Sequence, residues 1–123
     1  MAFVANLKES PKPMKKLITE ILKFRNDRDW EQFHDSKNLA LALSIEASEL
    51  NELFLWKNSA DDIENVSKTR LAEELADVLV YALLLAEKND LDIESIILDK
   101  LEKNNKKYPV DKSRGNSKKY TDL

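Results

Sequence analysis

Residues 75–86 read "LADVLVYALLLA", and Asp77 is the only charged side chain in this run. The run is shorter than the ~20 apolar residues that a membrane-spanning helix needs. Read as a helix, it has almost no polar face, and such a helix is normally buried on all sides. One small helical chain can hardly cover it completely. We therefore predict that this helix joins copies of the chain into a homodimer or a homotetramer.

Glycine and proline are nearly absent from the chain around this run. The only glycine is Gly115, and the three prolines are Pro11, Pro13 and Pro109, so residues 14–108 contain neither helix breaker. The period-2 alternation of β-branched and aromatic residues that is typical of strands is also missing. These features predict an all-α protein. The lack of glycine also excludes a P-loop or a GxGxxG phosphate loop in the body of the chain.

Apolar periodicity predicts four helices, packed as a four-helix bundle, over residues 14–27, 36–56, 68–88 and 93–106. The side chains expected to cap the last three are Asp35 or Ser36, Ser67 and Asp92. A polar connector with a possible helical turn fills residues 57–66. The predicted organisation is one helical domain with an extension before it and a basic C-terminal tail after it, at residues 14–108, 1–13 and 109–123.

The composition excludes several classes of function. The 123 residues, 42% apolar and 35% charged, fit one soluble globular domain. The net charge of −3 argues against bulk electrostatic binding to nucleic acid, and the absence of cysteine excludes disulfides and thiolate chemistry. The first ten residues, "MAFVANLKES", lack the apolar core of a signal peptide. We expect a cytoplasmic protein whose partners include neither a membrane nor a nucleic-acid polymer.

Two pairs of acidic residues interrupt apolar helix faces. In "EASEL", residues 46–50, Glu46 falls within an apolar stripe and Glu49 lies about 60° to one side. In "EELAD", Glu74 and Asp77 repeat the arrangement on the next long helix. Antiparallel packing of the two helices brings the four carboxylates together. Because like charges at close range need cations or protons, and all-oxygen ligation suits Mg²⁺ or Mn²⁺, we predict a metal site.

Other interpretations of these acids remain open. Glutamates spaced i, i+3 on a helix are most often solvated and paired with lysine or arginine. A ferritin-like di-iron site needs Glu-x-x-His motifs on two helices, and the single histidine, His34, lies in a predicted loop. A non-catalytic helical dimerisation module, in which the acids are only structural, is a further alternative.

Several motifs resemble those of the all-α nucleoside triphosphate pyrophosphohydrolases, the MazG-like superfamily. "EASEL" and "EELAD" are similar to its ExxE and ExxD carboxylate motifs. The motifs "RDWEQFH", "ELFLWK", "NNKKYPVDKSRG" and "KKYTDL" look more specifically like its dCTP pyrophosphatase branch. The resemblance covers nearly all of residues 15–123. It implies the four-helix MazG-type fold and Mg²⁺-dependent cleavage of a nucleoside triphosphate, most simply dCTP or a modified dCTP, to the monophosphate and diphosphate.

The resemblance also implies roles for individual residues. It assigns the metal ligands to Glu46, Glu49, Glu74 and Asp77, and the catalytic task of orienting the attacking water to Glu46 or Glu49. It assigns the contacts with base and sugar to Trp30, His34, Trp56 and Tyr81. On a continuous helix Trp56 lies about 10.5 Å beyond Glu49 along the same edge. A broad or differently specific triphosphate pyrophosphatase is the alternative activity.

Overall fold

The computed structural model describes residues 13–123, and in this part of the chain every regular element is helical. The four long helices are α2 (Pro13–Asp27), α3 (Ser36–Glu52), α5 (Lys68–Lys88) and α6 (Ile93–Lys107). The short elements are η1 (Glu31–Phe33), α4 (Ala60–Glu64), α7 (Val110–Ser113) and η2 (Tyr120–Asp122). The predicted all-α class and its four long helices are confirmed. Except for Pro13, the predicted N-terminal extension lies outside the described residues.

Side-chain caps begin three of the long helices where the sequence predicted them. The side chains of Asp35, Ser67 and Asp92 each accept a hydrogen bond from the backbone N–H three residues later, at 2.7 Å, 3.3 Å and 2.9 Å. Each bond satisfies one of the N–H groups that a helix start leaves without an intrahelical partner, and such a cap typically contributes ~1 kcal/mol. The starting points of α3, α5 and α6 are thus determined locally.

Helix α3 ends at Glu52, so the predicted helix over residues 36–56 is four residues too long. After Glu52 the backbone turns through bonds to the third preceding residue, such as Phe54 N–H to the Asn51 carbonyl at 3.0 Å. Trp56 follows in a left-handed conformation with φ of 65°. The edge of α3 does not continue to Trp56, and the prediction that this residue lies 10.5 Å beyond Glu49 along it is wrong.

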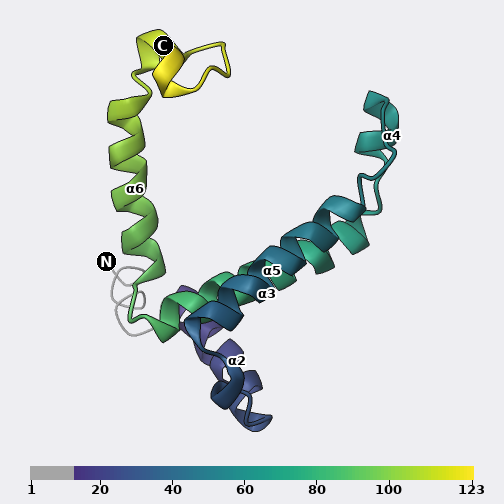
Figure 1. Ribbon diagram of the computed structural model, residues 1–123, viewed down its shortest axis with the longest axis vertical. Helices are drawn as coiled ribbons and strands as arrows, with labels where there is room; N and C mark the ends of the chain where they lie inside the picture. Colours follow the sequence, from purple (N-terminus) through teal and green to yellow (C-terminus); the bar gives the residue numbers. More distant parts are fainter. Residues whose placement is uncertain (1–12) are drawn as a thin grey trace, which may run out of the picture. The chain divides into compact units, whose positions relative to one another are not determined.

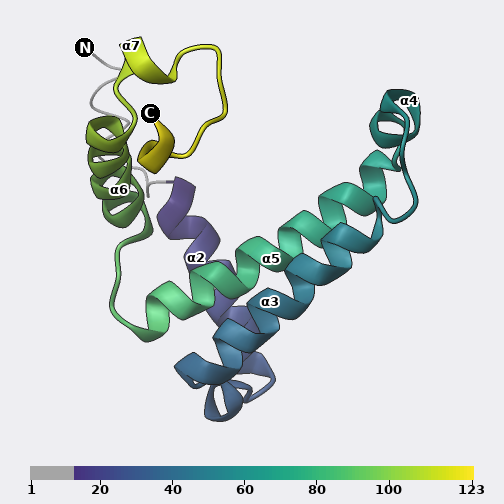
Figure 2. The same ribbon diagram turned by 45° about the horizontal axis from the view of Figure 1, so that its top comes forward.

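Helices α3 and α5 form an antiparallel pair, joined at one end through α4 (Figures 1 and 2). At the other end Asn89 Nδ2 donates to Ser36 Oγ at 3.1 Å and ties the end of α5 to the start of α3. Helix α2 packs against α5. The buried apolar side chains of the described chain are Leu39, Leu53, Leu83, Leu84 and Ala86. This packing places the inner faces of α3 and α5, with their acids, opposite one another.

Residues 90–123 form a second compact unit with α6, α7 and η2. Within it, the rings of Tyr108 and Tyr120 meet edge to face at 6.0 Å between centroids. The ammonium of Lys107 lies 4.9 Å from the Tyr120 ring centroid, within the range of a cation–π contact. The basic tail is therefore folded back on the end of α6. No helix in the described part of the chain is long and apolar enough to cross a membrane.

Candidate active site

Carboxylates from α3 and α5 meet between the two helices. One oxygen from each of Glu46, Glu74 and Asp77 lies within 4.8 Å of the other two. Glu46 and Glu74 are half-buried, whereas Asp77 is exposed. The cluster forms because each helix carries two acids spaced i, i+3 on the face that it turns toward its antiparallel partner. The predicted convergence of Glu46, Glu74 and Asp77 is therefore what the structure shows.

Glu49 is the fourth predicted ligand and lies beside this trio without belonging to it. Its charge and its side-chain hydrogen bonding raise the pKa of both Glu46 and Glu74. Helix spacing places Glu49 about 60° from Glu46, so its carboxylate approaches the cluster from one side. Glu49 is thus a neighbour of the trio that adds negative charge to the site.

The cluster strongly favours bound protons or cations. The pKa of Glu46 is raised to about 7, first by burial and then by the nearby carboxylates of Glu49, Asp77 and Glu74 in that order. Burial also raises the pKa of Glu74, with Glu49 and Asp77 adding to the effect and Arg70 opposing it. Like charges at this range cannot all stay ionised without a counter-charge. Without a metal ion, the Glu46 carboxyl is therefore partly protonated near neutral pH.

A divalent cation fits the donor set. Glu46 Oε2 and Glu74 Oε2 are both buried and have no hydrogen-bond partner. Within residues 13–123 none of the clustered carboxylates forms an ion pair with lysine or arginine. Buried carboxylate oxygens without partners are costly unless an ion or a proton satisfies them. Because the donors are all oxygens, Mg²⁺ and Mn²⁺ are the ions that suit them best.

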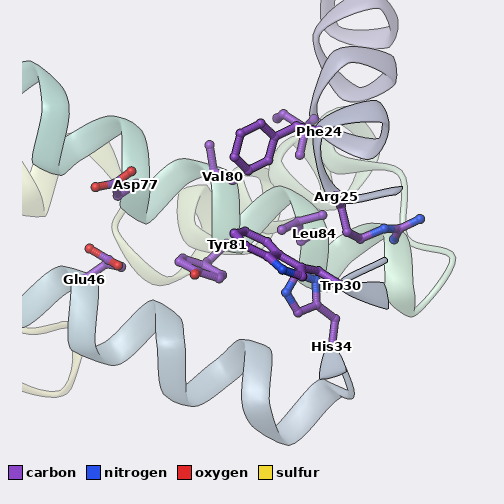
Figure 3. A pocket seen from close by; sticks show the side chains of 10 residues that line it. Phe24, Arg25, Trp30, His34, Glu46, Asp77, Val80, Tyr81 and Leu84 are labelled. Atoms are coloured by element: carbon purple, nitrogen blue, oxygen red, sulfur yellow. The ribbon is translucent and has the colours of Figure 1, made fainter. Parts of the chain in front are cut away.

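A pocket of about 140 Å³ opens beside the carboxylates. It is lined by Ile21, Phe24, Arg25, Trp30, His34, Glu46, Asp77, Val80, Tyr81 and Leu84. Figure 3 shows Glu46 and Asp77 at one end, Tyr81 next to them, and Trp30 with His34 beyond. A cavity of ~150 Å³ is large enough to hold one six-membered ring. The pocket thus combines a ring-sized aromatic compartment with an acidic end.

The aromatic wall is built by the turn between α2 and α3. Asp29 takes a left-handed conformation with φ of 53°, and Gln32 Nε2 donates to its carbonyl and to its Oδ2, both at 3.0 Å. Trp30 then meets the Phe24 ring edge to face, with 5.8 Å between centroids. The guanidinium of Arg28 lies 3.7 Å from the Phe24 centroid. These contacts hold Trp30 in one orientation against the pocket.

Tyr81 connects the two ends of the pocket. Its pKa is raised, first by burial and then by the charges of Glu46, Asp77 and Glu49. The phenol therefore remains protonated at neutral pH and can donate a hydrogen bond. Its position i+4 from Asp77 on α5 explains why the hydroxyl and the carboxylate share one face.

Three of the four predicted substrate-binding residues line the pocket, and one does not. Trp30, His34 and Tyr81 are among its lining side chains. Trp56 is not, because α3 ends before it, and the side chain is 84% exposed. Arg25 also lines the pocket and was not predicted from the sequence, although helical spacing puts it about 40° from Ile21 on the apolar face of its helix. A charge on an apolar face was the signal that identified Glu46, and it applies equally to Arg25.

Comparison with known proteins supports a common origin. Residues 41–123 match the MazG-like family. The chain is 42% identical to dCTP pyrophosphatase 1 from Rattus norvegicus over 119 residues, which are 93% of this chain and 70% of the rat protein. The Homo sapiens dCTP pyrophosphatase 1 is 40% identical over 119 residues, with the same shares covered. The match over residues 41–123 includes the acidic residues of both helices.

A solved structure has a similar fold. It is the crystal structure of a pyrophosphatase from Archaeoglobus fulgidus, with a TM-score of 0.78 and 38% sequence identity. The similarity covers 81% of this chain and 95% of the archaeal chain. The fold of the chain is therefore similar to that of a protein named as a pyrophosphatase.

Proposed function

Since the chain belongs to the MazG-like family, we propose that it is a Mg²⁺-dependent dCTP pyrophosphatase that converts dCTP, or a modified dCTP, to dCMP and diphosphate. Relatives named dCTP pyrophosphatase 1 are between 40% and 44% identical to the chain. One observation supports the proposal most directly. Two carboxylates of a cluster that spans 4.8 Å also line a pocket with room for one ring.

The two ends of the pocket suit the two ends of a nucleotide. Glu46, Glu74 and Asp77, together with Glu49, would hold Mg²⁺ at the triphosphate end. An ion held there would supply a Lewis acid for the phosphate oxygens and for the attacking water. We assign to Glu46 or Glu49 the task of orienting the water that attacks the α phosphorus, because both are half-buried, Glu46 within the cluster and Glu49 next to it. The bond that breaks joins the α phosphorus to the bridging oxygen, which leaves with the diphosphate.

The aromatic end suits the nucleoside. A base stacks favourably on a tryptophan face, and Trp30 is 42% exposed at the pocket. The imidazole of His34 and the phenol of Tyr81 supply polar groups at the edge of a bound ring and sugar. We retain Trp56 as a predicted substrate contact from outside this pocket. The volume of about 140 Å³ is sufficient for the single ring of a pyrimidine.

A substrate panel tests the proposed function directly. The purified protein with Mg²⁺ is expected to release diphosphate from dCTP and 5-substituted dCTP with a higher kcat/KM than from dATP, dGTP, dTTP or CTP. Diphosphate and monophosphate should appear in equal amounts, since the α–β bond is cleaved. Similar kcat/KM values across the panel would support the broad-specificity alternative. A folded protein with no activity on any of these nucleotides would support the helical dimerisation module.

Replacing Trp30 by alanine is expected to raise KM for dCTP by about ten- to a hundredfold with a smaller effect on kcat. The physical reason is that base–aromatic stacking contributes ~1–3 kcal/mol per base. Steady-state kinetics measure the effect. Phe33→Ala is the matched control, because Phe33 follows in the same turn, is 61% exposed and is absent from the pocket lining. An unchanged KM for Trp30→Ala would show that Trp30 does not contact the base. A higher KM for Trp56→Ala would confirm Trp56 as a substrate contact.

We also propose that the enzyme is a homodimer or a homotetramer. Leu41 and Ile45 on α3 are 55% and 58% exposed, and they share a face of the helix. Leu75 and Leu79 on α5 are 44% and 53% exposed and are spaced in the same way. Exposed apolar pairs on two neighbouring helices are typical of surfaces that associate. A second copy of the chain is the partner that the sequence predicted for the α5 surface.

A further inference from the structure

Arg25 is a largely covered cation at the aromatic end of the pocket. Its side chain is only 13% exposed, although it projects from α2, a helix with no fully buried residue. Figure 3 shows it on the far side of Trp30 and His34 from Glu46 and Asp77. It is therefore too remote from the acidic cluster to serve as a counter-charge for it. A covered charge that does not neutralise the site requires another explanation.

Both the side chain and the backbone carbonyl of Arg25 contact the turn that forms the aromatic wall. Its Nε and Nη2 donate to Asn26 Oδ1 at 2.9 and 2.8 Å, and Nη2 lies 3.5 Å from Glu31 Oε2. Its backbone carbonyl accepts hydrogen bonds from Trp30 N–H at 3.2 Å and from Arg28 N–H at 3.3 Å. The planar guanidinium makes its contacts with Asn26 and Glu31 in fixed directions, which a flexible ammonium cannot reproduce. Arg25 thus fixes the turn from within the pocket wall.

His34 closes the same wall, and its environment disfavours a positive charge. Burial lowers the pKa of His34, and the charge of Arg25 lowers it further. The other ionisable groups around it are Glu46 from α3, Asp77 and Tyr81 from α5, Glu31 in η1 and the adjacent Asp35. His34 Nδ1 is buried and has no hydrogen-bond partner. The unpaired, buried nitrogen shows that no acceptor stabilises a proton there, and the ring of His34 lines the pocket.

We propose that Arg25 is a positioning residue for the nucleobase. It holds the turn that carries Trp30 and His34, and its charge disfavours a second positive charge on the imidazole. The proposal rests on the proposed function, because a nucleotide is the ligand whose base would meet His34. A neutral imidazole can hydrogen-bond the edge of an uncharged base at little desolvation cost, whereas an imidazolium is costly to desolvate. Arg25 itself acts through its neighbours.

The single histidine makes this proposal directly measurable. The His34 imidazole resonances can be followed by NMR against pH in the wild type and in variants, without any substrate. Arg25→Gln is expected to raise the pKa of His34, whereas Arg25→Lys keeps the charge and leaves it near the wild-type value. Lys23→Gln is the matched control, since Lys23 lies on the same helix, is 68% exposed and pairs with Asp27. An identical His34 titration in the wild type and Arg25→Gln overturns the proposal.

Kinetics provide the second measurement. Arg25→Gln is expected to raise KM for dCTP by about five- to tenfold, the loss of roughly one hydrogen bond, with kcat nearly unchanged. The rise should be larger at pH 6 than at pH 8, because protonated His34 is the weaker binding form. If Arg25→Gln does not fold, the wild type still decides, because a His34 pKa at or above the ordinary 6.5 overturns the proposal. A wild type inactive on dCTP that shows the expected titrations refutes only the proposed function.

Discussion

Asp77→Asn is expected to lower kcat for dCTP by about two to three orders of magnitude, the scale on which removing one preorganised electrostatic group affects an enzyme. Asp77 contributes one of the three oxygens that lie within 4.8 Å of one another. Asparagine keeps the shape of the side chain but removes the charge that attracts a divalent cation. Because Asp77 is exposed, the substitution leaves no buried cavity and the fold should be retained. Diphosphate release at saturating dCTP measures kcat.

The same substitution is expected to raise the melting temperature of the metal-free protein by a few degrees. The charge of Asp77 helps to raise the pKa of Glu46, so the two carboxylates repel one another in the folded state. Loss of activity together with higher stability is the result expected of a binding site whose charges oppose folding. A merely structural acid would lose stability when it is neutralised. Glu73→Gln is the matched control, because Glu73 is an exposed acid on the same helix outside the cluster.

The acidic cluster was predictable because its cause is local. Glu46 and Glu74 stand out from the sequence as charges on apolar helix faces, and the 3.6-residue period alone determines those faces. The capping side chains Ser67 and Asp92 likewise act within one turn of the chain, so they could be assigned before any packing was known. Family resemblance was needed only to give the cluster a substrate.

The place of Trp56 and the contacts of Arg25 could not be predicted from the sequence, because both depend on turns without a residue signature. Helix α3 ends in backbone hydrogen bonds to the third preceding residue and in a φ of 65° at Trp56. No glycine or proline lies nearby that would have indicated this helix end. Arg25 lines the pocket because the turn after Asp27 folds back onto α2. In this turn Asp29 adopts a positive φ although it is not a glycine. Local hydrogen bonds, such as Lys57 N–H to the Phe54 carbonyl and Gln32 Nε2 to the Asp29 carbonyl, both at 3.0 Å, stabilise these conformations.

Removal of divalent ions with EDTA is expected to abolish activity, and Mg²⁺ should restore it and raise the melting temperature more at pH 8 than at pH 5.5. Glu46 has a pKa of about 7 in the folded protein and 4.5 as an ordinary glutamate. The stability from its proton is complete below 4.5 and is lost as the pH rises through about 7. Mg²⁺ competes with that proton, so its affinity should rise over the same interval and level off above it.

The size of the effect follows from mass action, which gives about 2.7 kcal/mol of added stability at a hundred times Kd. Thermal melts with and without Mg²⁺ at several pH values measure it, and Glu46→Gln serves as the internal comparison. Glutamine cannot bind the competing proton, so the pH dependence of the Mg²⁺-induced shift should weaken in this variant even where some binding persists through Glu74 and Asp77. A Mg²⁺-induced shift that is equal at pH 5.5 and pH 8 in the wild type would mean that the ion binds away from Glu46. The pH dependence therefore locates the ion at the cluster independently of any loss of activity.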